Sequence, residues 1–137
     1  MLHFFFHARG TRLQKTKEGM FRSLLNQLCR KSVATYSIVT SFFRQKDVDF
    51  GKFGESWHWN ASELERLFGD AITDAMKSDE VTLFVDALDE AGLEIAPQLA
   101  EYFQALESKL PIEERKVKIC ISCRHYLHLR IVSLWRY

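Results

Sequence analysis

The sequence has few of the features that mark secreted or membrane proteins. Its three cysteines are too few, and odd in number, for a disulfide framework, which favours a reducing compartment such as the cytoplasm. No apolar stretch approaches the ~18 residues that a transmembrane helix needs, and the segment from Met1 to His7 is too short for a signal peptide. The formal net charge of +1 gives no general attraction to nucleic acids or anionic membranes. We therefore expect a cytoplasmic protein that binds neither nucleic acid nor membrane.

The chain also lacks a phosphate-binding glycine loop. None of its six glycines stands in the frame G-x-x-x-x-G-K-S/T, whose backbone N–H groups and lysine cradle nucleotide phosphates. An apolar strand nevertheless ends in carboxylates, in the run Val81-Thr82-Leu83-Phe84-Val85-Asp86-Ala87-Leu88-Asp89-Glu90. This run has the form of a Walker B motif. The sequence therefore predicts the metal-and-water half of a nucleotide site without its phosphate-binding half.

Apolar runs with strand character alternate with segments that have helical spacing. The first run is continuous, as in a buried parallel strand, and the initiator Met at its head predicts that the natural domain begins upstream. The expected elements are, in order, a strand from Leu2 to Phe6, a helix from about Lys17 to Lys31, a partly helical connection with a packed loop from Ser32 to Trp59, a helix capped by Asn60 or Ser62, the strand from Val81, a helix with Pro97 in its first turn that stops at Pro111, a strand from Val117 to Ser122, and a short strand over Leu127 to Leu134. Strands that alternate with helices predict an α/β fold with a mainly parallel sheet.

Charged residues fall at the carboxyl ends of two expected strands, which is where ligands bind in such sheets. Asp86 is the natural metal residue, because Mg²⁺ keeps several waters and takes one or two carboxylates. Glu90 is placed to orient or deprotonate the attacking water, with Asp89 as the competing candidate, and the forked guanidinium of Arg124 suits the terminal phosphate. The simpler interpretations are a solvated acidic turn that caps a helix and an ordinary surface arginine. The four apolar residues before Asp86 and the matching strand before Arg124 favour the nucleotide interpretation.

A zinc site is the weaker alternative for the second of these strand ends. Cys120 and Cys123 have the C-x-x-C spacing, with His125 and His128 nearby. Cys120 lies inside the expected strand, however, and points away from the face of Cys123. No second cysteine pair exists, so we expect no zinc here.

Together these segments resemble the NACHT domain of the STAND class of P-loop NTPases, in particular the nephrocystin-type N-terminal NTPase segment of fungal NACHT proteins. The resemblance runs in order from about residue 3 to about residue 126. Its matching pieces are His3-Phe4-Phe5-Phe6 with Arg9-Gly10, the helix from Met20 to Leu28, the Walker B run from Leu83 to Glu90, and the sensor strand from Lys118 to Tyr126.

The resemblance implies a partial NACHT NTPase domain over residues 1–126 and a tail without a counterpart over 127–137. The complete domain is a three-layer α/β/α P-loop fold, of which the first strand and the P-loop are missing. The resemblance further implies that Asp86 binds Mg²⁺, that Glu90 or Asp89 serves the water, and that Arg124 contacts the γ-phosphate. ATP or GTP would then act as a switch for oligomerisation, with slow hydrolysis.

Three functions are compatible with this reading. The first is a NACHT fragment that neither binds nor hydrolyses nucleotide by itself and carries no cofactor. The second is part of a longer, active ATP- or GTP-dependent switch. The third is a non-enzymatic interaction module that pairs with intact NACHT proteins or with itself. Because the P-loop strand and a covering helix are missing, we expect the strand from Val117 to Ser122 to promote association, and a charge at Ile119 or Ile121 to reduce it.

Overall fold

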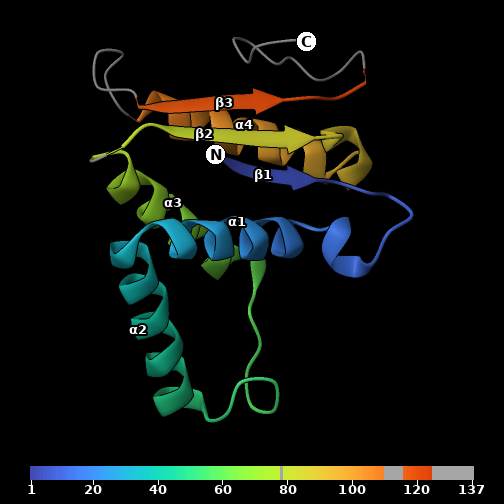
Figure 1. Cartoon of the computed structure of the whole chain (residues 1–137). Coiled ribbons are helices and arrows are strands. Elements are labelled where there is room, and N and C mark those ends of the chain that lie inside the picture. The colour runs from blue at the N-terminus through green and yellow to red at the C-terminus, as the bar shows by residue number, and fades with distance from the viewer. Residues whose placement is uncertain (78, 110–115, 125–137) are drawn as a thin grey trace.

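The computed structural model describes residues 1–77, 79–109 and 116–124 (Figure 1). Within these residues three parallel strands lie in the order β1-β2-β3, and their bounds are Leu2–Phe5, Val81–Asp86 and Val117–Ile121. The helices are α1 (Lys17–Lys31), α2 (Val33–Phe50), α3 (Ala61–Ala75) and α4 (Ile95–Ser108), with short 3-10 turns η1 (Arg12–Gln14) and η2 (Leu88–Ala91). The expected α/β fold with a parallel sheet is confirmed. The strand expected over Leu127 to Leu134 and the helix stop at Pro111 lie outside the described residues.

Short polar side chains fix where α1 and α3 begin. The Thr16 hydroxyl accepts a hydrogen bond from the Gly19 N–H at 3.2 Å, and the Asn60 side chain accepts one from the Glu63 N–H at 2.8 Å. Each satisfies a backbone N–H that has no partner in the first turn of a helix. Of the two caps considered for α3, Asn60 is therefore confirmed, and Ser62 lies inside the helix.

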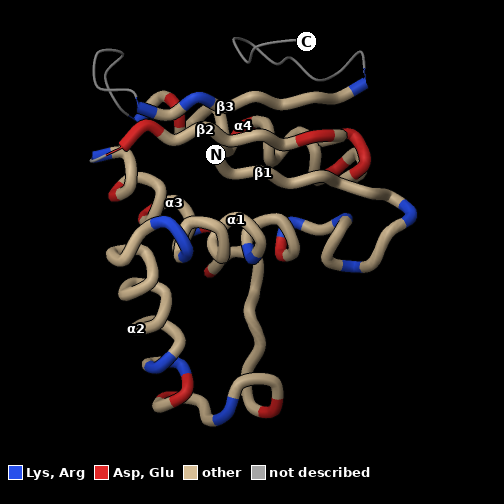
Figure 2. The backbone as a smooth tube through the Cα atoms, viewed as in Figure 1, with Lys and Arg blue, Asp and Glu red and all other residues tan. Residues whose placement is uncertain are grey.

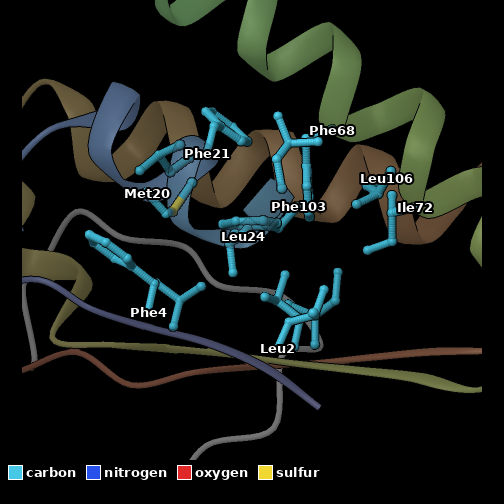
Figure 3. Packing of buried hydrophobic residues seen from close by; sticks show 14 of the residues in the cluster. Leu2, Phe4, Met20, Phe21, Leu24, Phe68, Ile72, Phe103 and Leu106 are labelled. Atoms are coloured by element: carbon cyan, nitrogen blue, oxygen red, sulfur yellow. The ribbon is translucent and has the colours of Figure 1, made fainter. Parts of the chain in front are cut away.

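One face of the sheet forms the hydrophobic core with the helices. The inward residues of the strands are at most 9% exposed, namely Leu2, Phe4, Val81, Leu83, Val85, Val117, Ile119 and Ile121. Figure 3 shows Leu2 and Phe4 facing side chains from three helices, which are Met20, Phe21 and Leu24 of α1, Phe68 and Ile72 of α3, and Phe103 and Leu106 of α4. The sheet and these helices form two layers in the described part of the chain.

The opposite face of the sheet carries the alternate strand residues, and no described helix covers it. Phe5 is 59% exposed and Phe84 is 38% exposed, whereas the parallel sheets of α/β proteins normally have both faces covered. Ile119 and Ile121 do not belong to this face. They are 1% and 6% exposed and point into the core, so a charge at either residue, which was expected to reduce association, would be placed in the core and not on the exposed face.

The segment expected to be partly helical from Ser32 onward forms one long helix and then a loop. α2 continues to Phe50, and among its residues only Thr35 is fully buried, which explains why no apolar stripe marks it in the sequence. The loop after it is packed as expected. Trp57 is 7% exposed, its ring lies 5.2 Å from that of Phe43, and its indole N–H donates to Asp47 Oδ1 at 2.9 Å.

Candidate functional site

The loops that follow the three strands meet at the carboxyl edge of the sheet, and backbone hydrogen bonds hold them in register. The Phe6 N–H donates to the Asp86 carbonyl oxygen at 3.1 Å, which joins the ends of β1 and β2. The Ser122 N–H donates to the Val85 carbonyl oxygen at 2.9 Å, and the Leu88 N–H returns a bond to the Ser122 carbonyl oxygen at 3.0 Å. These bonds fix the directions in which the side chains after each strand leave the sheet.

Asp86 is the last residue of β2, and its carboxylate lies against the end of β3. The Ser122 hydroxyl donates a short hydrogen bond to Asp86 Oδ1. Ser122 Oγ also lies 3.4 Å from the Ala87 N–H, so one hydroxyl bridges the Asp86 side chain and the backbone that follows it. Ala87 has φ 55° and ψ 45°, a left-handed conformation that is uncommon outside glycine and that turns the chain sharply into η2.

Asp89 binds Arg124, although the two residues are 35 positions apart. Arg124 Nε lies 2.8 Å from Asp89 Oδ2, and the Arg124 backbone N–H donates to Asp89 Oδ1 at 3.3 Å. The Asp89 side chain is only 2% exposed, whereas that of Arg124 is 76% exposed. Asp89 therefore anchors both the guanidinium and the backbone after β3. This burial and double contact leave Asp89 poorly suited to orienting a water.

Glu90 connects the same edge to the loop after β1. Its Oε2 accepts a hydrogen bond from the Ala8 backbone N–H at 2.7 Å, and its Oε1 lies 3.9 Å from the Arg124 guanidinium. The Glu90 side chain is 30% exposed, so it is far more accessible than that of Asp89. Glu90 is thus the carboxylate that touches all three loops of the edge.

The structure brings all four candidate residues together at one edge. Asp86 ends β2, Asp89 and Glu90 follow it in η2, and Arg124 follows β3, the neighbouring strand. Figure 2 shows the acidic residues gathered where β2 ends, and a basic residue near the end of the segment after β3. An acidic cluster beside one arginine is an arrangement that can share a metal ion and a phosphate group.

Two participants were not identified from the sequence. Ser122 was counted only as a strand residue, although a hydroxyl that directly follows the neighbouring strand is a signal that could have been used. The Ala8 N–H gave no signal, because every residue other than proline carries the same backbone donor. Both contacts depend on pairing between distant segments.

The zinc interpretation gains no support from the geometry. Within residues 1–77, 79–109 and 116–124, no group of three or more His, Cys, Asp or Glu side chains could hold a metal ion by itself. The two histidines of that interpretation, His125 and His128, lie outside the described residues.

The described part of the chain also contains no helix with the length and apolarity needed to cross a membrane.

Comparison with known protein families identifies the family of this chain. The family model described as nephrocystin 3, N-terminal, matches residues 1–124, which includes all three strands and every residue of the carboxyl edge. No curated protein and no solved structure matches the chain.

Proposed function

The chain belongs to the nephrocystin 3 N-terminal family, and from that premise we propose that it is the Walker B and sensor segment of a NACHT-type signal-transduction NTPase. The proposal rests mainly on one observation, the convergence of Asp86, Glu90 and Arg124 at the carboxyl edge of two adjacent parallel strands. Ligands of open α/β sheets bind outside this edge. We place the protein in the cytoplasm, in keeping with its low and odd number of cysteines.

The donor set suits Mg²⁺ that is shared with a nucleotide better than a cation held by the protein alone. Asp86 offers one carboxylate, with Ser122 beside it, and Mg²⁺ commonly takes one or two carboxylates and completes its shell with waters and phosphate oxygens. When bound, the ion would neutralise charge that develops on the phosphates. Asp86 would hold the ion, and Ser122 would orient the Asp86 carboxylate.

The remaining groups divide the other tasks of phosphate chemistry. We assign the attacking water to Glu90, because its carboxylate is the more exposed of the two candidates. Arg124 would contact the γ-phosphate, and Asp89 would hold its guanidinium in place through the Nε contact. Asp89 is in this view a positioning residue.

We propose that the chain by itself neither binds nor hydrolyses ATP or GTP. No G-x-x-x-x-G-K-S/T segment occurs in its 137 residues, so it has neither the backbone cradle nor the lysine that holds the phosphates. Carboxylates without that cradle repel an anionic nucleotide. In a longer product that supplies a P-loop, the same edge would work as half of an ATP- or GTP-dependent switch.

Two measurements test this function. Calorimetric titration of the 137-residue chain with ATP or GTP and Mg²⁺ should give no binding, and turnover should equal the buffer background. A chimera that joins this chain to the P-loop segment of an intact family member should bind Mg²⁺-nucleotide, and Asp86→Ala should abolish the Mg²⁺ dependence. Turnover by the isolated chain that Glu90→Gln abolishes would refute the claim of inactivity, and a chimera whose binding ignores Asp86 would refute the site.

The alternative is a non-enzymatic module that pairs with intact NACHT proteins through its sheet. The exposed apolar face with Phe5 and Phe84 is the observation that favours it. Co-purification of the tagged chain with a full-length relative distinguishes the two functions, provided that Phe84→Asp reduces the recovery and Asp86→Ala does not.

A further inference from the structure

The three carboxylates at the carboxyl edge do not all face the same neighbouring strand. β2 lies between β1 and β3, and both Asp86 and Asp89 accept hydrogen bonds from residues that follow β3. Glu90 differs, because its Oε2 accepts a hydrogen bond at 2.7 Å from the Ala8 N–H, in the loop after β1. One oxygen of Glu90 is therefore held on the opposite side of β2 from the contacts of the other two carboxylates.

The contact with Ala8 conflicts with the task assigned to Glu90. A residue that orients the attacking water needs a carboxylate oxygen beside the terminal phosphate, and Asp86 and Arg124 place the metal and that phosphate toward β3. Glu90 Oε1 lies 3.9 Å from the Arg124 guanidinium, so a rotation of the side chain can bring the carboxylate to that side without a movement of β2. Such a rotation breaks the hydrogen bond to Ala8.

The bond between Glu90 and Ala8 is firm and yet replaceable by water. Its length of 2.7 Å and its ionised acceptor are those of a charge-assisted hydrogen bond. Ala8 is exposed and the Glu90 side chain is 30% exposed, so water can take the place of either partner when the bond breaks. No buried donor is left unpaired, and Glu90 therefore has two accessible positions, which a switch requires.

The loop that carries Ala8 is a compact unit attached to α1. The His7 N–H donates to the Gln14 carbonyl oxygen at 2.8 Å, which closes the loop around Ala8. Arg12 binds Glu18 of α1 through contacts of 2.7 and 3.2 Å, and Figure 1 shows the segment after β1 passing from the edge of the sheet to the start of α1. Loss of the carboxylate contact therefore frees one side of a unit that stays tied to this helix.

We propose that the loop of residues 7–16 is a latch that holds Glu90 away from the water position, and that a nucleoside triphosphate opens this latch whereas a diphosphate does not. This regulation rests on the proposed function and concerns the same site. The water that Glu90 orients attacks the γ-phosphate, so only a triphosphate favours the turned side chain. The latch then couples the presence of the γ-phosphate to the loop before α1.

Amide exchange with water, measured by NMR on the complete chain, tests the latch without nucleotide. Glu90→Ala should speed the exchange of the Ala8 amide at least ~10-fold, and Glu90→Gln, which keeps an acceptor, should restore part of the protection. The matched control is Glu94→Ala, which removes an exposed carboxylate that caps no backbone N–H of α4 and should leave the exchange of Ala8 unchanged. Equal exchange in the wild type and in Glu90→Ala would overturn the latch.

The chimera with a P-loop segment tests the dependence on the γ-phosphate. Mg²⁺ with a β,γ-imido analogue of ATP or GTP should speed the exchange of the Ala8 amide, and the diphosphate should leave it slow. Because coupling is reciprocal, Ala8→Pro, which removes the donor, should tighten binding of the analogue by up to ~10-fold. Ala8→Gly keeps the donor and should keep the latch, and circular dichroism checks that both variants are folded.

The outcomes separate the latch from the proposed function. A chimera that binds the triphosphate analogue while the Ala8 amide still exchanges slowly would overturn the latch and leave the proposed function standing. Equal acceleration by the diphosphate would overturn the selectivity for the γ-phosphate. A chimera that binds no nucleotide would overturn the proposed function and, with it, the regulation of the site by a triphosphate.

Discussion

Two consecutive residues of β3 provide a sharp test of how the sheet is oriented. Ile119 is 1% exposed and lies opposite Leu83 in the core, whereas Cys120 is half-buried and points to the uncovered face. We expect Ile119→Asp to unfold the chain and Cys120→Asp to leave it folded. The two variants differ by one position and introduce the same charge, so each is the control for the other.

The expected cost at Ile119 has two parts. Removal of the buried side chain costs about 2–5 kcal/mol, by analogy with Ile→Ala changes in cores. A carboxyl group in this apolar site has its pKa raised by up to ~3–5 units, which costs a further ~4 kcal/mol at neutral pH, because a carboxyl whose pKa rises above the solution pH is protonated and pays no more than that. The sum is comparable with the total stability of ~5–15 kcal/mol that is typical of a domain. A charge at Cys120 should cost less than ~1 kcal/mol, as is usual at sites that remain in contact with water.

Urea unfolding followed by circular dichroism measures both variants, at concentrations where self-association is negligible. Ile119→Val is the conservative control and should lose only ~0.5–1.5 kcal/mol. If Cys120→Asp proved the more damaging change, the faces of β3 would be reversed. Because a shift of one residue in register exchanges the two faces, that result would refute the sheet register.

Three further predictions concern single contacts. Asp89→Asn removes the buried charge that binds Arg124, so the free energy of unfolding in urea should fall by roughly 1–2 kcal/mol. The value is modest because the guanidinium is exposed. An unchanged free energy would mean that this ion pair does not hold the segment after β3. Gly19→Ala should lower the Tm, although alanine normally favours a helix by ~1 kcal/mol, because the new Cβ would lie 1.7 Å from a backbone carbonyl oxygen of η1; an unchanged or raised Tm would contradict this close approach. The hydrogen bond from Arg12 holds the pKa of Glu18 below its ordinary value. The stability that this pair provides is therefore present above the unfolded pKa of ~4.3 and is lost as the pH falls through the folded pKa. Glu18→Gln should reduce the dependence of the unfolding free energy on pH in this acid range, and curves of equal slope for the two proteins would contradict the pairing.

The elements and the motif positions could be predicted from the sequence, because both depend on local patterns. Continuous apolar runs predicted the strands, and helical spacing predicted α1, α3 and α4 to within a few residues. α2 was underestimated because it packs through partly buried residues, without the regular stripe that marks a helix in the sequence. The strand ends that carry the candidate site could also be predicted, since carboxylates after an apolar run are visible without any tertiary information.

The tertiary structure decided which of these side chains meet. Local patterns do not distinguish Asp89 from Glu90 as the residue that would orient a water. Only the pairing of β2 with β3 places Asp89 in a buried contact with Arg124 and leaves Glu90 accessible. The Ser122 and Ala8 contacts likewise join segments that are 36 and 82 residues apart. A strand also presents alternate residues to its two faces, but its sequence does not say which face the helices cover. Ile119 and Cys120 acquired opposite roles only when α1, α3 and α4 packed on one side of the sheet, because burial is a property of the assembled layers and not of the strand.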